Sequence, residues 1–99
     1  MEITYLKNNI EKRIKKKTQS DPIARRNMTI LANAPCYLDI TGKKAHFLIG
    51  DKNGCFRMDF NPPSRLICEP IGAFKNKDGR FIKETITSIQ IVKIETDYH

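Results

Sequence analysis

The spacing of apolar residues changes once along this 99-residue chain, and that change limits the folds it can adopt. Up to residue 34 the apolar side chains recur every three or four positions, as they do on one face of a helix. From residue 45 onward, short apolar runs alternate with turn-forming Asn, Gly and Pro. Helices followed by a meander of strands predict an α+β sandwich in which the helices cover one face of the sheet.

Two helices are expected in the first third of the chain. Residues 6–18 place their apolar side chains on one stripe and their lysines opposite it. Residues 2–5 fit either a short first strand or an extension of that stripe. Asp21 and Pro22 together form a helix start signal, with Asp21 as the N-cap and Pro22 in the first helical position. The second helix should therefore begin at Pro22 and end before Pro35.

The rest of the chain is predicted to form strands joined by turns. The expected strands are 45–49, 55–60, 65–69 and 85–95. Asn53-Gly54 tolerates the positive φ angles of a tight hairpin turn. A long loop at 71–83 should turn at Lys77-Asp78-Gly79. The last strand carries apolar residues on both of its faces (Ile89 and Ile91; Val92 and Ile94), which indicates a central position in the sheet.

Positive charge is concentrated at the start of the chain. Residues 1–26 hold eight Lys and Arg against three acidic residues, whereas the remainder holds ten against eight, within a net charge of +7. Such a basic segment suits a polyanion, either nucleic acid or an acidic protein segment. A solvated helix face that binds nothing accounts for the charge equally well.

The remaining composition predicts a single cytoplasmic domain spanning residues 1–99. Three cysteines without a Cys-x-x-Cys pair favour reduced thiols that act as small core residues. No apolar run approaches the ~20 residues that a membrane-spanning helix needs. We expect no metal and no cofactor.

The residues whose side chains suit catalysis are two histidines, one arginine and the aspartate and tyrosine of the terminal tripeptide. His46 opens an apolar run, Arg65 follows a Pro-Pro turn, and the chain ends in Asp97-Tyr98-His99. When the 2′-hydroxyl of RNA attacks the adjacent phosphate, the reaction needs a base, an acid and cations that bind the phosphate. These residues supply all three. Each also has an ordinary structural role: His46 in packing, Arg65 in an ion pair, and the terminus as a frayed end.

Several segments of the chain resemble one toxin family. His46–Asp51 is similar to a His-x-Leu-x-Gly-Asp motif, and Gly54–Met58 to a Gly-x-aromatic strand. Arg65–Pro70 resembles an Arg-Leu-Ile-Phe-Glu-Pro strand, and the terminal Asp97-Tyr98-His99 matches a terminal Asp-Tyr-His. This combination resembles the killer-type (HigB) toxins of bacterial toxin–antitoxin pairs, within the RelE/ParE superfamily. Residues 24–39 match that family weakly.

The resemblance implies a RelE-like fold with two N-terminal helices packed on a mainly antiparallel sheet of three to five strands. It also implies a ribosome-dependent, metal-independent mRNA endonuclease, neutralised by a HigA-like helix-turn-helix antitoxin. The implied catalytic residues are His46, Arg65, Asp97, Tyr98 and His99. We assign His46 as general base and His99 as general acid, because the adjacent α-carboxylate favours the protonated imidazole. The cations expected to contact RNA are Lys12, Arg13, Lys16, Lys44 and Lys52.

Two positions depart from the family pattern. Many relatives have Lys where this chain has Ile49, and an aromatic residue where it has Ser64. Lys44 or Lys52 could replace the lost charge. These departures leave open a non-catalytic binding protein that keeps the fold. A ParE-type gyrase inhibitor is a further alternative, against which the retained histidine and terminal tripeptide argue.

Overall fold

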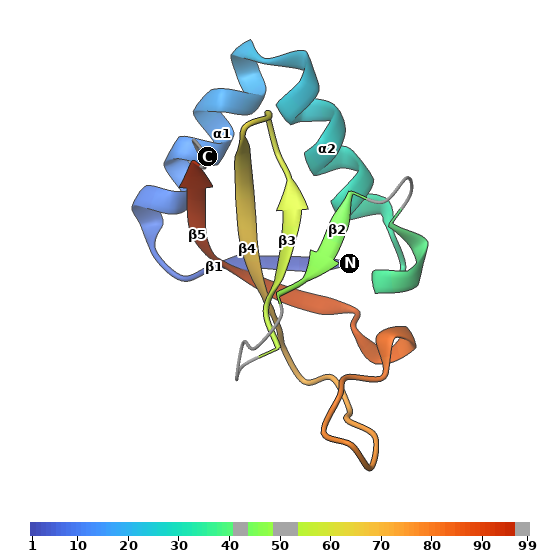
Figure 1. The fold of residues 1–99 in the computed structure, drawn as a ribbon. Helices are drawn as coiled ribbons and strands as arrows, with labels where there is room; N and C mark the ends of the chain where they lie inside the picture. Colours follow the sequence, from blue (N-terminus) through green and yellow to red (C-terminus); the bar gives the residue numbers. More distant parts are fainter. Residues whose placement is uncertain (41–43, 49–53, 97–99) are drawn as a thin grey trace.

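The computed structural model describes residues 1–40, 44–48 and 54–96 as an α+β fold with one five-stranded sheet (Figure 1). The helices are α1 (Asn8–Ser20) and α2 (Pro22–Asn33), and the strands are β1 (Glu2–Tyr5), β2 (Ala45–Phe47), β3 (Phe56–Asp59), β4 (Ser64–Pro70) and β5 (Ser88–Thr96). The strand order is β1-β5-β4-β3-β2. β1 runs parallel to β5, and the other three pairs are antiparallel. The predicted α+β class, with two helices and a mainly antiparallel sheet of three to five strands, is confirmed.

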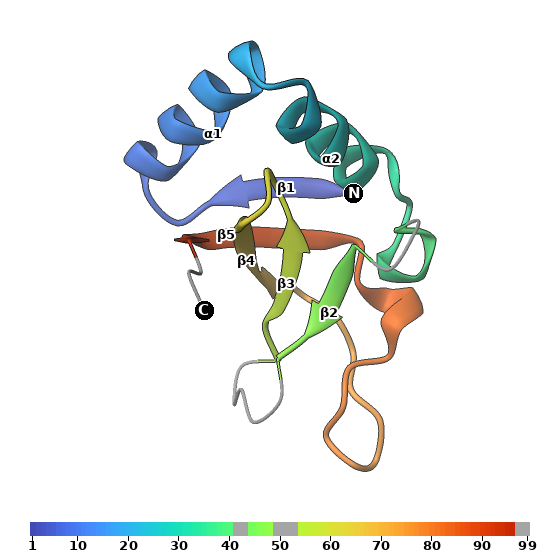
Figure 2. The same cartoon turned by 45° about the horizontal axis from the view of Figure 1, so that its top comes forward.

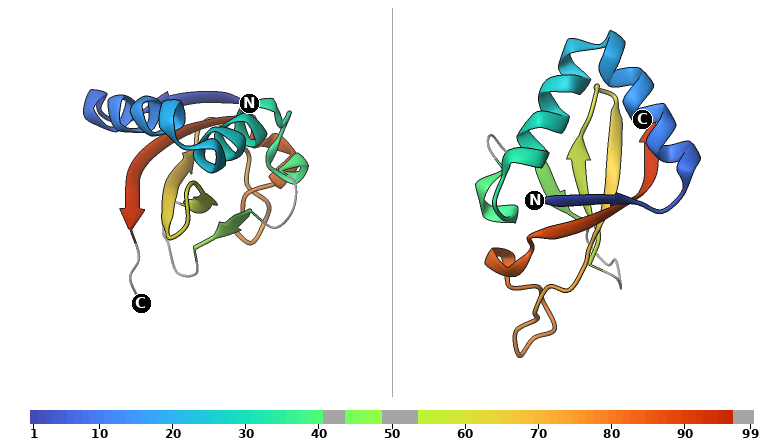
Figure 3. Two further views of the ribbon diagram at one scale, coloured as in Figure 1. Left: turned by 90° about the horizontal axis from the view of Figure 1, so that it is seen from above. Right: turned by 180° about the vertical axis from the view of Figure 1, so that it is seen from behind.

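The two helices form a hairpin on one side of the sheet, as Figures 2 and 3 show from three directions. Asp21 links them. Its backbone N–H donates to Lys17 O (2.8 Å) at the end of α1, and its side chain accepts from the N–H groups of Ile23 (2.9 Å) and Ala24 (3.3 Å) at the start of α2. The predicted N-cap is therefore confirmed, with Pro22 in the first turn.

The hydrophobic core lies between this helix hairpin and the sheet. Its fully buried members include Ile14 and Leu31 from the helices and Phe56, Met58 and Leu66 from the strands. Each such side chain contributes about 1.5–3 kcal/mol of burial free energy relative to an exposed position. The strand residues that alternate with these three therefore point to the opposite face of the sheet.

The start of the chain forms a strand rather than a longer helix. Ile3 pairs with Ile89 and packs against the core. This residue also fits the apolar stripe of a longer helix, but in the structure it belongs to β1. Helix α1 begins at Asn8, two residues later than predicted. Leu6 lies between the two elements and is 51% exposed, so its expected place in the apolar stripe is wrong.

A β-bulge in β5 explains the apolar residues that the sequence placed on both faces. Ile67 pairs with Lys93 whereas Cys68 pairs with Ile91, which leaves Val92 as the extra residue. The bulge changes the phase of the strand, so Ile89, Ile91 and Ile94 all pair with helix-facing residues of β4. The central position predicted for this strand is confirmed, since β5 lies between β1 and β4.

The remaining predictions are confirmed in part. Gly54 has φ +70° and Gly79 has φ +78°, as turns require, whereas Asn53 lies outside the described residues. Cys55 and Cys68 are buried, but Cys36 is not, so only two of the three thiols fill the interior. Neither helix of the described chain has the length and apolar character to cross a bilayer.

Candidate functional site

The sheet face that points away from the helices gathers polar side chains from four strands. These residues alternate with the core residues of the same strands, so their direction follows from the two-residue period of β structure. They are Lys44, His46, Arg57, Asp59, Arg65, Lys93 and Glu95. Two residues predicted to be catalytic, His46 and Arg65, thus share one face, which we call the open face.

His46 lies directly opposite Arg57 across the β2–β3 pair. Hydrogen bonds flank this pair on both sides, from Asp59 N to Lys44 O (2.9 Å) and from Leu48 N to Cys55 O (3.0 Å). Residues opposite each other in an antiparallel ladder have Cβ atoms about 5 Å apart. The exposed imidazole therefore has a guanidinium as its immediate cross-strand neighbour.

Arg65 lies at the start of β4, opposite Asp59 on β3 and Glu95 on β5. Arg57 pairs with Ile67, two residues further along β4, so Arg65 is the diagonal neighbour of Arg57. Diagonal neighbours in a sheet are roughly 7–8 Å apart, within reach of long side chains. Only strand β3 separates Arg65 from His46, and the two positions are offset by two residues along the strands, so they lie roughly 12 Å apart on the sheet.

Arg57 is a site residue that the sequence reasoning missed. Its Nε atom is buried and makes no hydrogen bond within the described chain. Beside it on β4 lies Ile67, which is only 7% exposed although it belongs to the open face and not to the main core. A buried donor without an acceptor costs about 1–3 kcal/mol, so the fold holds this arginine beside His46 at a cost in stability. The sequence does contain a signal for Arg57: the hairpin turn expected between the strands of residues 46 and 57 implies that Arg57 lies opposite His46.

The short edge strand that carries His46 is supported by aromatic packing. Tyr37 donates its hydroxyl to Ala45 O (3.1 Å), and its ring lies 4.7 Å from that of Phe47 and 5.0 Å from that of Phe56, measured between centroids. Burial raises the pKa of the Tyr37 phenol, which keeps it a hydrogen-bond donor at neutral pH. These contacts fix β2 from the core side and leave His46 facing outward.

The other predicted catalytic residues, Asp97, Tyr98 and His99, lie outside the described residues, as does Lys52. The last described residue, Thr96, pairs with Ser64, which precedes Arg65. The described part of β5 therefore ends beside the strand position of Arg65.

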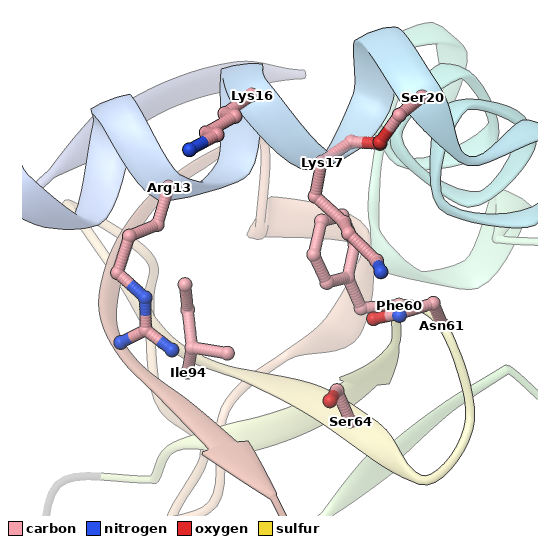
Figure 4. Close-up of a pocket in the computed structure, with 8 residues that line it drawn as sticks. All are labelled: Arg13, Lys16, Lys17, Ser20, Phe60, Asn61, Ser64 and Ile94. Atoms are coloured by element: carbon pink, nitrogen blue, oxygen red, sulfur yellow. The ribbon is translucent and has the colours of Figure 1, made fainter.

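A second basic feature is a cleft of about 450 Å³ between α1 and the β3–β4 turn (Figure 4). The residues that line it are Arg13, Lys16, Lys17, Ser20, Phe60, Asn61, Ser64 and Ile94. Figure 4 shows Arg13 and Lys17 extending from α1 toward the strands. Of the predicted RNA-binding cations of α1, Arg13 and Lys16 line this cleft and Lys12 does not.

The wall of the cleft opposite α1 is fixed by a buried amide. Asn27 of α2 is 2% exposed and donates from Nδ2 to Phe60 O at 2.6 Å. This bond ties the helix hairpin to the turn that carries Asn61 and Ser64. Lys17 pairs with Asp21 at 3.8 Å, whereas Arg13 and Lys16 form no ion pair within the described chain. The cleft thus presents cations, hydroxyls and an amide, which together suit a phosphate group.

Neither feature looks like a metal site. Across residues 1–40, 44–48 and 54–96, His, Cys, Asp and Glu side chains do not gather in groups of three or more. In comparisons with known proteins, no family model matches the chain, and neither a curated protein nor a solved structure matches it.

Proposed function

We propose that this chain is the toxin of a type II toxin–antitoxin pair and acts as an mRNA endonuclease that blocks translation. The observation that carries the proposal is the shared open face of His46 and Arg65, with Arg57 between them in the sheet. A base and two guanidinium groups on one solvent-exposed surface fit the needs of RNA cleavage. The basic cleft beside α1 supplies a further place for the RNA backbone.

In the proposed mechanism, His46 accepts the proton of the ribose 2′-hydroxyl, and the resulting alkoxide attacks the adjacent phosphorus. Arg65 and Arg57 stabilise the extra negative charge of the phosphorane. The bond to the 5′-oxygen then breaks, and His99 protonates that oxygen. The products are a 2′,3′-cyclic phosphate and a 5′-hydroxyl end.

Arg57 has a specific place in this proposal. The resemblance leads us to expect a phosphate-binding lysine where the chain has Ile49. Arg57 presents a cation beside His46 from the neighbouring strand. We assign it the phosphate contact that the missing lysine would have made. A planar guanidinium can hold two phosphate oxygens at once, which a lysine cannot.

The partners in the proposal rest on the resemblance. They are a HigA-like helix-turn-helix antitoxin, the ribosome, and mRNA in the ribosomal A site, all in the cytoplasm. The net charge of +7 is consistent with a ribonucleoprotein target.

Induction of the chain in a bacterium, followed by primer extension on translated mRNA, tests this function. We expect growth arrest and new 5′ ends within codons for the intact chain. Both should be lost with His46→Ala, Arg65→Ala, or deletion of Tyr98 and His99. Glu84→Ala is the matched control, because Glu84 is exposed and lies outside the open face.

The same experiment separates the alternatives. Growth arrest accompanied by DNA damage, without mRNA cleavage, would support a gyrase inhibitor. Expression of folded protein without arrest would support a non-catalytic binding protein. Cleavage that persists in both His46→Ala and Arg65→Ala would refute the assignment of the open face as the active site.

A further inference from the structure

The loop between β4 and β5 is an ordered hairpin that projects away from the sheet (Figures 1 and 2). We call residues 71–83 the arm. Backbone hydrogen bonds join its two sides, from Ile82 N to Phe74 O and from Asn76 N to Arg80 O, both 2.8 Å. The Asn76 side chain closes the tip by accepting from two backbone N–H groups at 2.9 and 3.1 Å. The arm is therefore a hairpin closed by its own hydrogen bonds.

The base of the arm is fixed to the body of the protein. Thr85 Oγ1 accepts from Phe74 N (2.9 Å) and donates to Ile82 O (2.6 Å). The Phe81 ring packs against the core and occupies the space beside Gly54 that a side chain would need. One side of the hairpin thus faces inward, through Phe81, and the other side faces solvent.

The solvent side of the arm presents an aromatic ring. Phe74 is 69% exposed and pairs with Ile82, which is 37% exposed. Arg80 lies on the same side, because it is two residues from Ile82 in a regular hairpin. Both backbone groups of Phe74 are hydrogen-bonded, so the backbone from which the ring extends is fixed to the arm and to Thr85.

The arm that carries this ring is rich in positive charge. The arm carries four cations against one anion: Lys75, Lys77, Arg80 and Lys83 against Asp78. Lys75 lies over the Phe81 ring at 4.9 Å, and Lys83 lies near the Tyr37 and Phe47 rings at 5.9 and 5.8 Å. None of the four forms an ion pair within the described chain. Among the exposed large apolar residues, Phe74 has the largest exposed fraction and lies in the most basic loop.

We propose that the arm binds a single-stranded polynucleotide, with one base stacked on Phe74 and the neighbouring phosphates held by Lys77 and Arg80. An exposed ring flanked by cations is the arrangement that single-strand binding proteins use without sequence preference. A stable protein interface needs roughly 1,000 Å² or more, and the three exposed large apolar side chains of the arm, Ile71, Phe74 and Ile82, offer a much smaller apolar area than that. The inference goes beyond cleavage, because a chain without nuclease activity would bind through the same arm.

Fluorescence anisotropy with a labelled 2′-O-methyl oligonucleotide of about 12 nucleotides tests the arm, since single-strand sites span roughly 4–16 nucleotides. This probe has no free 2′-hydroxyl, so the nuclease cannot cut it. Phe74→Leu keeps an apolar side chain but removes the stacking surface, and should weaken binding about fivefold or more. Phe74→Tyr should bind within about twofold of the natural chain. Ile23→Ala, at an exposed apolar position on α2, should not change binding.

Salt dependence tests the phosphate contacts. Replacing both cations (Lys77→Gln with Arg80→Gln) should reduce the slope of log K against log salt concentration by about 1.4, or about 0.7 for each lost contact. Circular dichroism should show that every variant is folded. If Phe74→Leu binds the strand as tightly as the natural chain, base stacking is refuted. If Phe74→Leu weakens binding to polyglutamate or to phosphatidylserine vesicles by the same factor, the arm recognises anions or surfaces in general, and the proposal is overturned.

Discussion

Replacing Arg57 with methionine should make the protein more stable and the proposed nuclease less active. The Nε atom of Arg57 is buried without a hydrogen bond, which costs the folded state about 1–3 kcal/mol. Arg57→Met keeps an unbranched stem next to Ile67 and removes that donor. We expect a net gain of about 1 kcal/mol, which raises Tm by about 4–8 °C for a domain of this size.

The expected loss of activity comes from the positive charge of the guanidinium group. If Arg57 holds a phosphate oxygen in the transition state, its removal takes away one charge-assisted donor. Loss of one such donor typically reduces the catalytic rate by about 10²–10³-fold. Purified protein added to a translating extract, with primer extension over time, measures the rate of cleavage, and urea denaturation measures stability. Opposite changes in the two are typical of a residue kept for function at a cost in stability.

Lys93→Met is the matched control. Lys93 flanks Ile67 from the other side, on β5, and its Nζ lies 4.0 Å from Glu95, so it is a solvent-exposed cation with a partner. Its replacement should leave both stability and cleavage nearly unchanged. A lower Tm for Arg57→Met would show that the guanidinium is paired in solution and has a structural role. Unchanged cleavage in a protein that cuts mRNA would show that Arg57 does not contact the phosphate.

Three further predictions concern the scaffold. Asn27→Ala should lose about 2 kcal/mol in urea denaturation, since it leaves a buried carbonyl of the β3–β4 turn without its donor; equal stability would show that the bond contributes nothing. Gly54→Ala should cost more than about 1 kcal/mol, because φ is +70° and the new Cβ would collide with the Phe81 ring; an unchanged Tm would contradict this. The thiol's hydrogen bond to Asp39 (3.1 Å) raises the pKa of Cys36. Asp39→Asn should therefore increase the thiolate fraction and speed the alkylation of Cys36 by iodoacetamide at pH 8. An unchanged rate would exclude that bond.

The helix hairpin was predictable because its signals are local. Asp21 and Pro22 set the start of α2 through contacts within three residues, and the observed cap uses the predicted side chain. The start of α1 was less predictable, since Ile3 suits a strand and a helical stripe alike. Its pairing with Ile89, 86 residues away, decides between them, and a sequence pattern carries no direct information about such a distant partner.

The bulge in β5 and the role of Arg57 were not predicted, because each depends on pairing with another strand. Val92 is an extra residue only in relation to β4, so the bulge cannot be seen in β5 alone. Arg57 gains its place from the register of the β2–β3 hairpin, and the resemblance drew attention to the glycine and aromatic residue before it. Asn76 was likewise overlooked, although it closes the arm's turn at Lys77-Asp78-Gly79.

The open face depends on the same register that builds the core. Met58 and Leu66 must point toward the helices, and strand alternation then sends Arg57 and Arg65 the other way. A slip of one residue in either hairpin would bury guanidinium groups, which is very costly, so the packing of the core also enforces the geometry of the site. Ile67 adds to this, because it lies beside Arg57 on the neighbouring strand and is only 7% exposed. An apolar neighbour reduces the water around the Arg57 stem and so strengthens the attraction between its guanidinium and a bound phosphate. The core therefore both places the cations of the proposed site and increases their effect.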